Sequence, residues 1–424
     1  MPEDRYGLEV TTTSPRALEF YGEALDRSLA QQSGAEELLR EAVAEDENFA
    51  LAWALLGLEE RGSGDITGGN KSVARAGAVA AKLTERERSQ LGVLDRFVAL
   101  DVLGCEKAMH AHADAWPRDA VIVMQSHFLY NIFDWRLDRD RRLFEFLSRV
   151  APSYGDDWFM AAELAFAVDE VGDHRRARDL AEQALEGNAM NGRAAHGMSH
   201  ALLEGGEPDT GASWLAGWLD SWDRGGSFGC HLWWHLALFS LALGDDAGAR
   251  RAYERIWGFK GEAVGVATDA PSLAWRLHLD DPSEPMPWGD LAALPDKPGF
   301  TFGNMHRALV LAGLGDAAAL TAYADTLAAL GESGHPTATL CAAFARGLAA
   351  DVRGDPGAAA RTIGDVAPSF RSFGGSHAQG EVLDDTFIAV LARAGERDEA
   401  ARRLRSRLDR RPSRRDERWV ERIG

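Results

Sequence analysis

Residues 157–188 have the sequence DWFMAAELAFAVDEVGDHRRARDLAEQALEGN, which decides the fold class. Apolar residues recur three to four positions apart on both sides of Gly172, and this is the spacing of an amphipathic helix. After the glycine, the apolar face contains Ala177, Ala181 and Ala184, whose small side chains allow a neighbouring helix to approach closely. The stretch therefore predicts two antiparallel helices joined by a turn at Gly172.

Similar helical pairs recur along the chain, separated by glycines at regular distances. These turn glycines are Gly64, Gly104, Gly172, Gly205, Gly244, Gly315, Gly354 and Gly395. Most of them follow one another after 33–41 residues, and two separations are about twice as long. A repeat of this length is typical of tetratricopeptide and HEAT-like helical hairpins. No stretch alternates convincingly between apolar and polar residues, so the predicted fold class is all-α.

Stacked helical hairpins bury a continuous core only through contacts with their neighbours. We therefore expect residues 1–424 to form one domain, a right-handed superhelix (α-solenoid) of tetratricopeptide-like hairpins. Three segments depart from the repeat: an N-terminal segment (1–30), a proline-rich connection over the groove (279–300) and a basic tail (410–424). The tail is either the solvated, frayed end of the last helix or a contact for an acidic partner.

The charge and composition of the chain exclude several classes of function. Among 424 residues, 66 acidic side chains exceed 46 basic ones, a formal net charge of −20. General nucleic-acid and anionic-membrane binders need a basic face, so neither class is expected. The sequence starts without the pattern of a secretory signal and has no run of about 18 apolar residues. Three separated cysteines without a CxxC pair argue against a disulfide scaffold, and we expect a cytoplasmic protein.

Two histidine pairs occupy equivalent places in successive repeats. His196 and His200 are four residues apart, as are His231 and His235, so each pair projects from one face of its helix. The two pairs are offset by 35 residues, which is the length of one repeat. His306 stands at the same distance from the next turn glycine as His235 does. We therefore expect the five imidazoles to converge on one cavity lined by the inner helices.

These imidazoles support three kinds of chemistry. Histidines four apart are a common ligand pair for transition metals such as zinc, and the metal ligands would be His196, His200, His231 and His235. A metal-free cluster can instead transfer protons, with His200 and His235 as candidate catalytic groups. In the third alternative, the histidines bind a ligand or bridge helices by hydrogen bonds. We prefer the metal-free alternatives and assign no cofactor, because no acidic or cysteine ligand accompanies the histidines at a recognisable spacing.

Tryptophan is concentrated in the same region of the chain. Eight of the 13 tryptophans lie within residues 214–288. They are either core residues or the lining of an aromatic cavity. Further along, residues 374–379 have the sequence GGSHAQ and precede a helical pattern. The backbone amides of this motif either cap the helix or receive an anion or a carbonyl group.

Four segments occur in a characteristic order: AAHGMSHALLEGG, CHLWWHLALF, GNMHRALVLAGLGD and FGGSHAQGEVL. In this order they resemble the tetratricopeptide repeat protein 38 family, over residues 154–395 and more weakly from residue 95. The resemblance implies a tetratricopeptide-like α-solenoid with a pocket, and no particular reaction. It assigns as ligand-binding candidates His127, Glu170, His196, His200, His231, Trp234, His235, Asp269, His306 and Gln379. It also adds Glu170 to the candidate catalytic groups. One departure is Arg193, which stands where family members carry tryptophan.

Two functions agree with these features. In the first, the protein binds a small molecule or a peptide in an internal pocket of its concave groove, lined by histidine and tryptophan, and a protein partner is a variant of this function. In the alternative, it is an enzyme that uses the histidines for acid–base or metal-dependent chemistry on a small metabolite. A small ligand is preferred over an extended peptide in both cases, because the histidines lie on inward helix faces.

Overall fold

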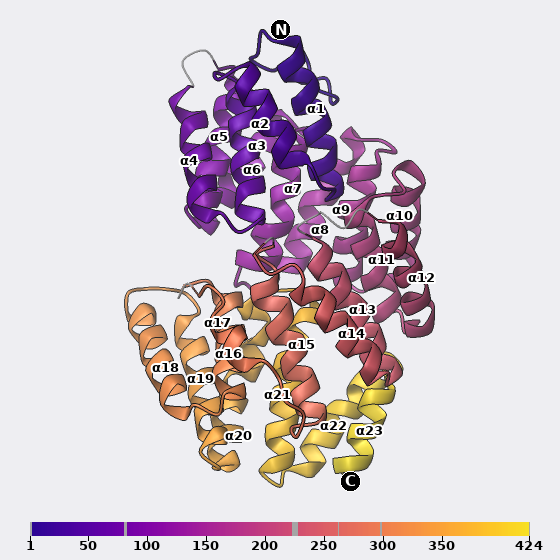
Figure 1. Cartoon of the computed structure of the whole chain (residues 1–424), viewed down its shortest axis with the longest axis vertical. Helices are drawn as coiled ribbons and strands as arrows, with labels where there is room; N and C mark the ends of the chain where they lie inside the picture. The colour runs from indigo at the N-terminus through magenta and orange to yellow at the C-terminus, as the bar shows by residue number, and fades with distance from the viewer. Residues whose placement is uncertain (1, 80–82, 223–227, 262, 297–298, 424) are drawn as a thin grey trace.

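The computed structural model describes residues 2–79, 83–222, 228–261, 263–296 and 299–423. Within these residues the chain is built from helices (Figure 1), and the β pairing found there is an isolated antiparallel bridge between Glu3 and Glu9. The prediction of an all-α solenoid built from helical hairpins is confirmed.

Most helices are three to four turns long, as expected for a repeat, although α16 has only 5 residues and α21 has 17. The N-terminal part contains α1 (Pro15–Ala30), α2 (Ala35–Glu45), α3 (Ala50–Gly62), α4 (Ile66–Ala78), α5 (Glu85–Val98), α6 (Val102–Ala115), α7 (Ala120–Phe128) and α8 (Arg139–Val150). The middle part contains α9 (Trp158–Glu170), α10 (His174–Gly187), α11 (Gly192–Glu204), α12 (Pro208–Ser221), α13 (Gly229–Leu243), α14 (Asp246–Trp257) and α15 (Val266–Asp280). The C-terminal part contains α16 (Trp288–Ala292), α17 (Thr301–Gly313), α18 (Ala317–Glu332), α19 (Ala338–Val352), α20 (Pro356–Val366), α21 (His377–Arg393), α22 (Arg397–Leu408) and α23 (Arg414–Ile423). A π-helical segment (Leu129–Phe133) and two 3-10 segments (Ala151–Ser153 and Ala367–Phe373) complete the described helices.

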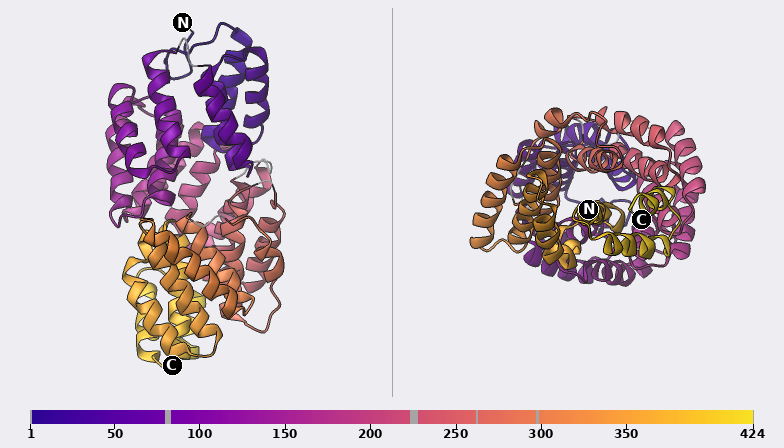
Figure 2. Two further views of the ribbon diagram at one scale, coloured as in Figure 1. Left: turned by 90° about the vertical axis from the view of Figure 1, so that its left-hand side faces the viewer. Right: turned by 90° about the horizontal axis from the view of Figure 1, so that it is seen from below.

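Consecutive helices pack side by side as hairpins, and the hairpins follow a superhelical path. Seen along its long axis, the molecule is a ring of helices, with the first and last helices at opposite ends of that axis (Figure 2). The three largest clusters of buried apolar residues follow one another along the path. This is the arrangement expected when each hairpin buries its core against its neighbours.

Most of the predicted turn glycines adopt the left-handed conformation that glycine tolerates best. Gly172 has a φ angle of 94° between α9 and α10, and Gly244 has a φ angle of 72° between α13 and α14. The aspartate after each glycine caps the next helix, because its carboxylate accepts a hydrogen bond from a backbone amide of the first turn. Glycine followed by aspartate therefore ends one helix and begins the next.

The turn predicted at Gly104 is wrong, because this glycine lies inside α6. The chain turns earlier, at Leu100, which has a φ angle of 58°. Asp101 then caps α6 by accepting a hydrogen bond from the Gly104 amide. A Cβ atom at Gly104 would lie 2.0 Å from the Asp101 carboxylate, so the glycine accommodates the cap.

Two of the three segments that depart from the repeat pattern contain helices of their own. Residues 1–30 include α1, and the predicted proline-rich connection (279–300) includes the end of α15 and the short helix α16. Residues 297–298 of that connection lie outside the described residues. Trp288 begins α16 and packs against α17, where a Cβ atom at Gly313 would come within 2.4 Å of the indole ring.

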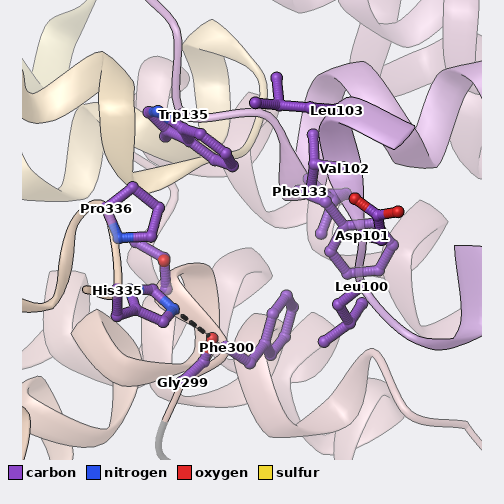
Figure 3. Close-up of a pocket in the computed structure, with 12 residues that line it drawn as sticks. Leu100, Asp101, Val102, Leu103, Phe133, Trp135, Gly299, Phe300, His335 and Pro336 are labelled. Carbon is purple, nitrogen blue, oxygen red and sulfur yellow. Dashed lines mark hydrogen bonds between the residues drawn. The ribbon is translucent and has the colours of Figure 1, made fainter. Parts of the chain in front are cut away.

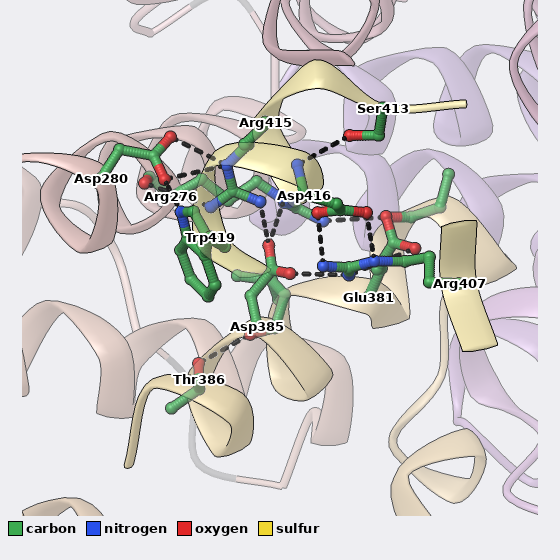
Figure 4. Close-up of polar contacts among 12 residues, drawn as sticks. Arg276, Asp280, Glu381, Asp385, Thr386, Arg407, Ser413, Arg415, Asp416 and Trp419 are labelled. Atoms are coloured by element: carbon green, nitrogen blue, oxygen red, sulfur yellow. Dashed lines mark hydrogen bonds and ion pairs between the residues drawn. The ribbon is translucent and has the colours of Figure 1, made fainter. Parts of the chain in front are cut away.

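The last two helices are held by a buried network of ion pairs (Figure 4). Asp385 on α21 accepts hydrogen bonds from Arg407, at 2.7 Å, and from Arg415, at 2.8 Å. Arg407 also donates to Asp416 at 2.7 Å, and Arg415 donates to Asp280 of α15 at 2.8 Å. Burial raises the pKa of Asp385, but Arg415 and Arg407 lower it by more, so the carboxylate is held ionised.

This network overturns the expectation of a solvated, frayed C-terminal end. Arg411 and Arg415 are 9% and 5% exposed. Arg411 pairs with Glu204 of α11 at 3.3 Å, and the Trp419 indole donates to Asp280 at 2.6 Å. Arg411, Arg415 and Arg418 find acidic partners within the same chain, and α23 closes against α13 and α15.

Replacing Asp385 by alanine tests this network. The change leaves Arg407 and Arg415 buried without their shared carboxylate, and breaking a buried ion pair costs about 3–5 kcal/mol. We expect a clear decrease in the urea concentration at the unfolding midpoint. The control is Arg418→Ala, which removes an exposed pair with Asp246 and should cost less than about 1 kcal/mol. Equal effects of the two changes would contradict the role of the network.

Candidate functional site

Four imidazoles from α11 and α13 form a buried cluster. We call His196, His200, His231 and His235 the histidine cluster. The ring of His235 lies 4.6–5.0 Å from each of the other three rings, measured between centroids. His200 and His235 are completely buried, and His231, the most exposed of the four, is 9% exposed. The structure thus brings together the two pairs that the 35-residue offset relates.

Aromatic side chains and a glycine hold the cluster in place. Phe166 of α9 stacks on His196, with ring centroids 5.2 Å apart and an interplanar angle of 17°. Trp234 stacks on His231 at 5.2 Å and 12°. A Cβ atom at Gly197 would lie 2.9 Å from Cβ of Ala165, so the glycine permits the close approach of α11 to α9. The local sequence therefore fixes both the depth and the orientation of the rings.

Hydrogen-bond geometry defines which nitrogen atoms of the cluster face one another. Nε2 of His196 lies 3.1 Å from Nε2 of His200 and 3.2 Å from Nε2 of His231. Nδ1 of His231 lies 3.1 Å from the Asp269 carboxylate of α15. Because a carboxylate accepts hydrogen bonds, Nδ1 of His231 carries the proton, and the lone pair of its Nε2 points toward His196.

Several polar atoms of the cluster have no hydrogen-bond partner among the described residues. They are both ring nitrogens of His235 and Nδ1 of His200. Nδ1 of His200 faces two carboxyl groups, those of Asp169 and Glu170, each at 3.7 Å. A buried polar group without a partner costs about 1–3 kcal/mol, so the fold retains these atoms at the expense of stability.

Burial sets the protonation state of three of the four imidazoles. It lowers the pKa of His196, His200 and His235 well below the ordinary value of 6.5, and repulsion from neighbouring histidines adds to this effect. Burial also raises the pKa of Glu170 well above its ordinary value, although Arg371 opposes the shift. The site therefore places uncharged imidazoles next to a carboxyl group that holds its proton more tightly than usual.

His127 of α7 extends the site on one side. Its ring lies 4.3 Å from Phe166 and 6.0 Å from His196. Burial, reinforced by the charge of Arg193, lowers the pKa of His127 to about 3. Arg193 pairs with the buried Glu163 at 3.0 Å, so the residue that departs from the family pattern supplies a charge beside the cluster.

Glu170 connects the cluster to α21. Its carboxyl group accepts a hydrogen bond from the backbone amide of His377, at 3.1 Å, and one from Arg371, at 3.3 Å. Gln379 accepts from the backbone amide of Ser376 at 2.9 Å and completes a capping box. The GGSHAQ motif is therefore a helix cap whose first helical amide binds Glu170.

Two of the predicted ligand-binding residues, His306 and Trp234, have surroundings that differ from those of the four clustered imidazoles. Nδ1 of His306 donates to the backbone carbonyl of Phe302 at 2.8 Å, and its ring packs on that of Phe302. Among the described residues, His306 makes no ring contact with the histidine cluster. Trp234 is completely buried behind His231, so it supports the cluster from within the core.

The eight tryptophans of residues 214–288 do not all belong to one type of environment. Trp214, Trp218 and Trp222 stack in succession along α12 and its C-terminal cap. Trp234 instead packs on an imidazole, and Trp275 donates its indole N–H to Thr386 of α21 at 2.9 Å. Core packing therefore accounts for several members of this group.

Sequence analysis missed the cavity shown in Figure 3, which has a volume of about 350 Å³. It lies where the turn before α6 meets the π-helical segment and the start of α17, and none of its lining residues belongs to the histidine cluster. Aromatic and aliphatic side chains dominate the lining, among them Leu103, Phe133, Trp135 and Phe300. Residues 100–135 form one side of the lining and residues 299–336 form the other, more than 160 positions later, so no local pattern signals the cavity.

Three groups of side chains have the composition and spacing of metal ligands. In the first, one nitrogen atom each from His196, His231 and His235 lies within 4.8 Å of the others. The second contains Asp140, Glu170 and His377, and the third contains Asp169, Glu170 and His200. Arg371 already forms ion pairs with Asp140 and Glu170, and each of the other two groups contains Glu170. The three-imidazole group is therefore the most suitable of the described groups for a cation.

Comparison with known proteins gives only distant similarities, which define neither a family nor a function. No protein-family model matches the sequence, and membership of the tetratricopeptide repeat protein 38 family stays a prediction. A tetratricopeptide repeat protein from Parabacteroides merdae is 11% identical over 72% of this chain and 98% of its own, with a TM-score of 0.35. Yeast Tom70 is 10% identical over 97% of this chain and 89% of its own, with a TM-score of 0.39. Similarities of this size carry no argument about function.

The P58(IPK) tetratricopeptide domain is 11% identical over 92% of this chain and 89% of its own, with a TM-score of 0.26.

Among the described residues, no helix combines the length and apolar character needed to cross a membrane.

The two adjacent tryptophans of α13 provide a test of the core behind the cluster. Trp234→Ala removes a fully buried indole, and such a loss costs about 3–5 kcal/mol. Trp233 is only partly buried and lies under Arg255, so Trp233→Ala should cost much less. Urea unfolding followed by circular dichroism measures both changes. A larger loss for Trp233→Ala would show that α13 is rotated relative to this description.

Proposed function

We propose that the protein is an enzyme that acts on a small molecule by proton transfer at the histidine cluster. The observation that carries this proposal is the set of unpartnered, completely buried nitrogen atoms on His200 and His235. Single unpartnered atoms also occur elsewhere, for example on Trp222 and Tyr253, but here three of them lie together on two adjacent imidazoles, and each one lowers stability. Active sites are the places where this cost is retained in exchange for function.

The protonation states of the cluster suit general acid–base chemistry. An uncharged imidazole accepts a proton, and a carboxyl group with a raised pKa can donate one. His200 and Glu170 provide such a pair, since Nδ1 of His200 lies 3.7 Å from Oε1 of Glu170. Titratable groups with shifted pKa values in one place are typical of catalytic sites.

The burial of the cluster favours a small ligand over an extended peptide. His231, the most accessible of the four imidazoles, is only 9% exposed, and His127 beside the cluster is equally exposed. A peptide lying along the superhelix would reach these edges without reaching His200 or His235. A small molecule that enters beside His127 and His231 is therefore the substrate that we propose.

Two leucine variants test whether the cluster is maintained for function. Neither ring nitrogen of His235 has a partner, so His235→Leu should increase the free energy of unfolding by about 1–3 kcal/mol. His231→Leu leaves the buried carboxylate of Asp269 unpaired and should decrease it by a similar or larger amount. Urea unfolding measures the free energy of unfolding of both variants. A metal chelator is present so that a bound metal ion does not contribute to either value.

The opposite signs of these two effects are the expected result. If His235→Leu destabilises the protein as much as His231→Leu does, His235 is a structural residue and the proposed site is lost. A further expectation concerns His200→Gln, which should leave the melting temperature nearly unchanged. Nδ1 of His200 has no hydrogen bond to lose, and the glutamine amide can replace the contact of Nε2 with His196.

A further inference from the structure

We propose that His196, His231 and His235 together bind one divalent transition-metal ion such as zinc. This inference rests on the proposed function and deepens it, because it names a cofactor for the same site. Imidazole nitrogen is a preferred ligand of zinc, copper, iron and nickel, and three protein ligands with one open position are typical of catalytic zinc.

The spacing of the nitrogen atoms suits a shared ion. Nε2 of His196 lies 3.2 Å from Nε2 of His231, and a nitrogen of His235 lies within 4.8 Å of both ligand atoms. Two nitrogen atoms bound tetrahedrally at about 2.0–2.1 Å from zinc are about 3.4 Å apart. In a shared site the His235 nitrogen would lie about 3.4 Å from each of the other two nitrogens, compared with at most 4.8 Å in this structure.

Asp269 supplies the outer contact that metal-binding histidines usually have. Its carboxylate lies 3.1 Å from Nδ1 of His231 and is itself 3% exposed. Histidine ligands commonly donate their second ring N–H to a carboxylate, which fixes the tautomer and leaves the other nitrogen free for the metal. Asp269 also contributes a negative charge close to the position of the cation.

His235 distinguishes a metal site from a network of hydrogen bonds. A hydrogen bond between His196 and His231 accounts for their 3.2 Å separation without any ion. It leaves His235 unexplained, because the ring of this residue lies among the other three imidazoles and neither of its nitrogens has a partner. A metal ion gives one of these nitrogens a ligand bond and thereby accounts for all three residues.

His200 stands beside the three ligands without joining them. Its Nε2 is 3.1 Å from Nε2 of His196, and its Nδ1 faces Asp169 and Glu170. The three-imidazole group leaves the fourth tetrahedral position open for water or for a substrate atom. His200 is then a base next to that position, which agrees with the role that the proposed function gives it.

The test uses the full chain without a histidine tag, freed of metal with a chelator and then titrated with Zn²⁺ against a chromophoric competitor. We expect one equivalent to bind. Substitution with Co²⁺ should give the strong visible bands of four-coordinate cobalt, because three imidazoles and one further ligand form a tetrahedral site. Weak bands of six-coordinate cobalt, or less than about 0.1 equivalent of zinc, would overturn the proposal.

Matched glutamine variants locate the ion. His235→Gln and His196→Gln should each weaken zinc binding at least 100-fold, whereas His306→Gln changes a buried imidazole outside the cluster and should leave binding unchanged. Asp269→Asn should weaken binding by about 10–100-fold while one equivalent still binds, since Asp269 positions a ligand. Circular dichroism verifies that each variant is folded. Full zinc binding by both folded ligand variants would overturn the assignment.

The outcomes separate this inference from the proposed function. If His235→Leu stabilises the protein but zinc does not bind, the metal is excluded and a metal-free acid–base site is retained. If zinc binds but His200→Gln and His235→Leu both behave as structural variants, the metal site stands and proton transfer by the cluster is excluded.

Discussion

The packing of α11 against α13 is the contact on which the candidate site depends. The two helices occupy equivalent positions in successive repeats, so residues 35 positions apart face each other across one interface. Histidine at two such positions, each with a second histidine four residues later, places four imidazoles in contact. The repeat therefore builds the cluster from helix faces alone, with the rigidity that a catalytic or metal-binding arrangement requires.

The closure of the C-terminal helices protects this arrangement. A solenoid is weakest at its ends, because a terminal hairpin has one neighbour instead of two. Here α23 returns to α13 and α15, and Asp385 links Arg407 and Arg415 in a buried network. The same α15 carries Asp269, which orients His231. The ion pairs at the end of the chain thus fix a helix that supports the site.

Sequence patterns predict the hairpins well, because apolar periodicity and glycine–aspartate turns are local signals. These signals fail at Gly104, because the chain turns earlier, at Leu100. Leu100 takes the left-handed conformation, which a bulky residue rarely adopts. Repeat arithmetic also predicts the contact among the four histidines. It does not place His306, because α17 packs mainly against α15 and α19 and the His306 ring packs on Phe302. The partners contributed by α9, such as Glu163 and Asp169, lack any spacing signal and emerge only in three dimensions.

We propose that the buried histidine cluster forms a site for a metal ion. The most direct measurement is a crystal structure of zinc-loaded protein with diffraction data collected on both sides of the zinc absorption edge. We predict one anomalous peak at about 2.0–2.2 Å from a nitrogen of His196, His231 and His235. Electron density without an anomalous peak in this place, with the imidazoles bridged by water or by one another, would contradict the account.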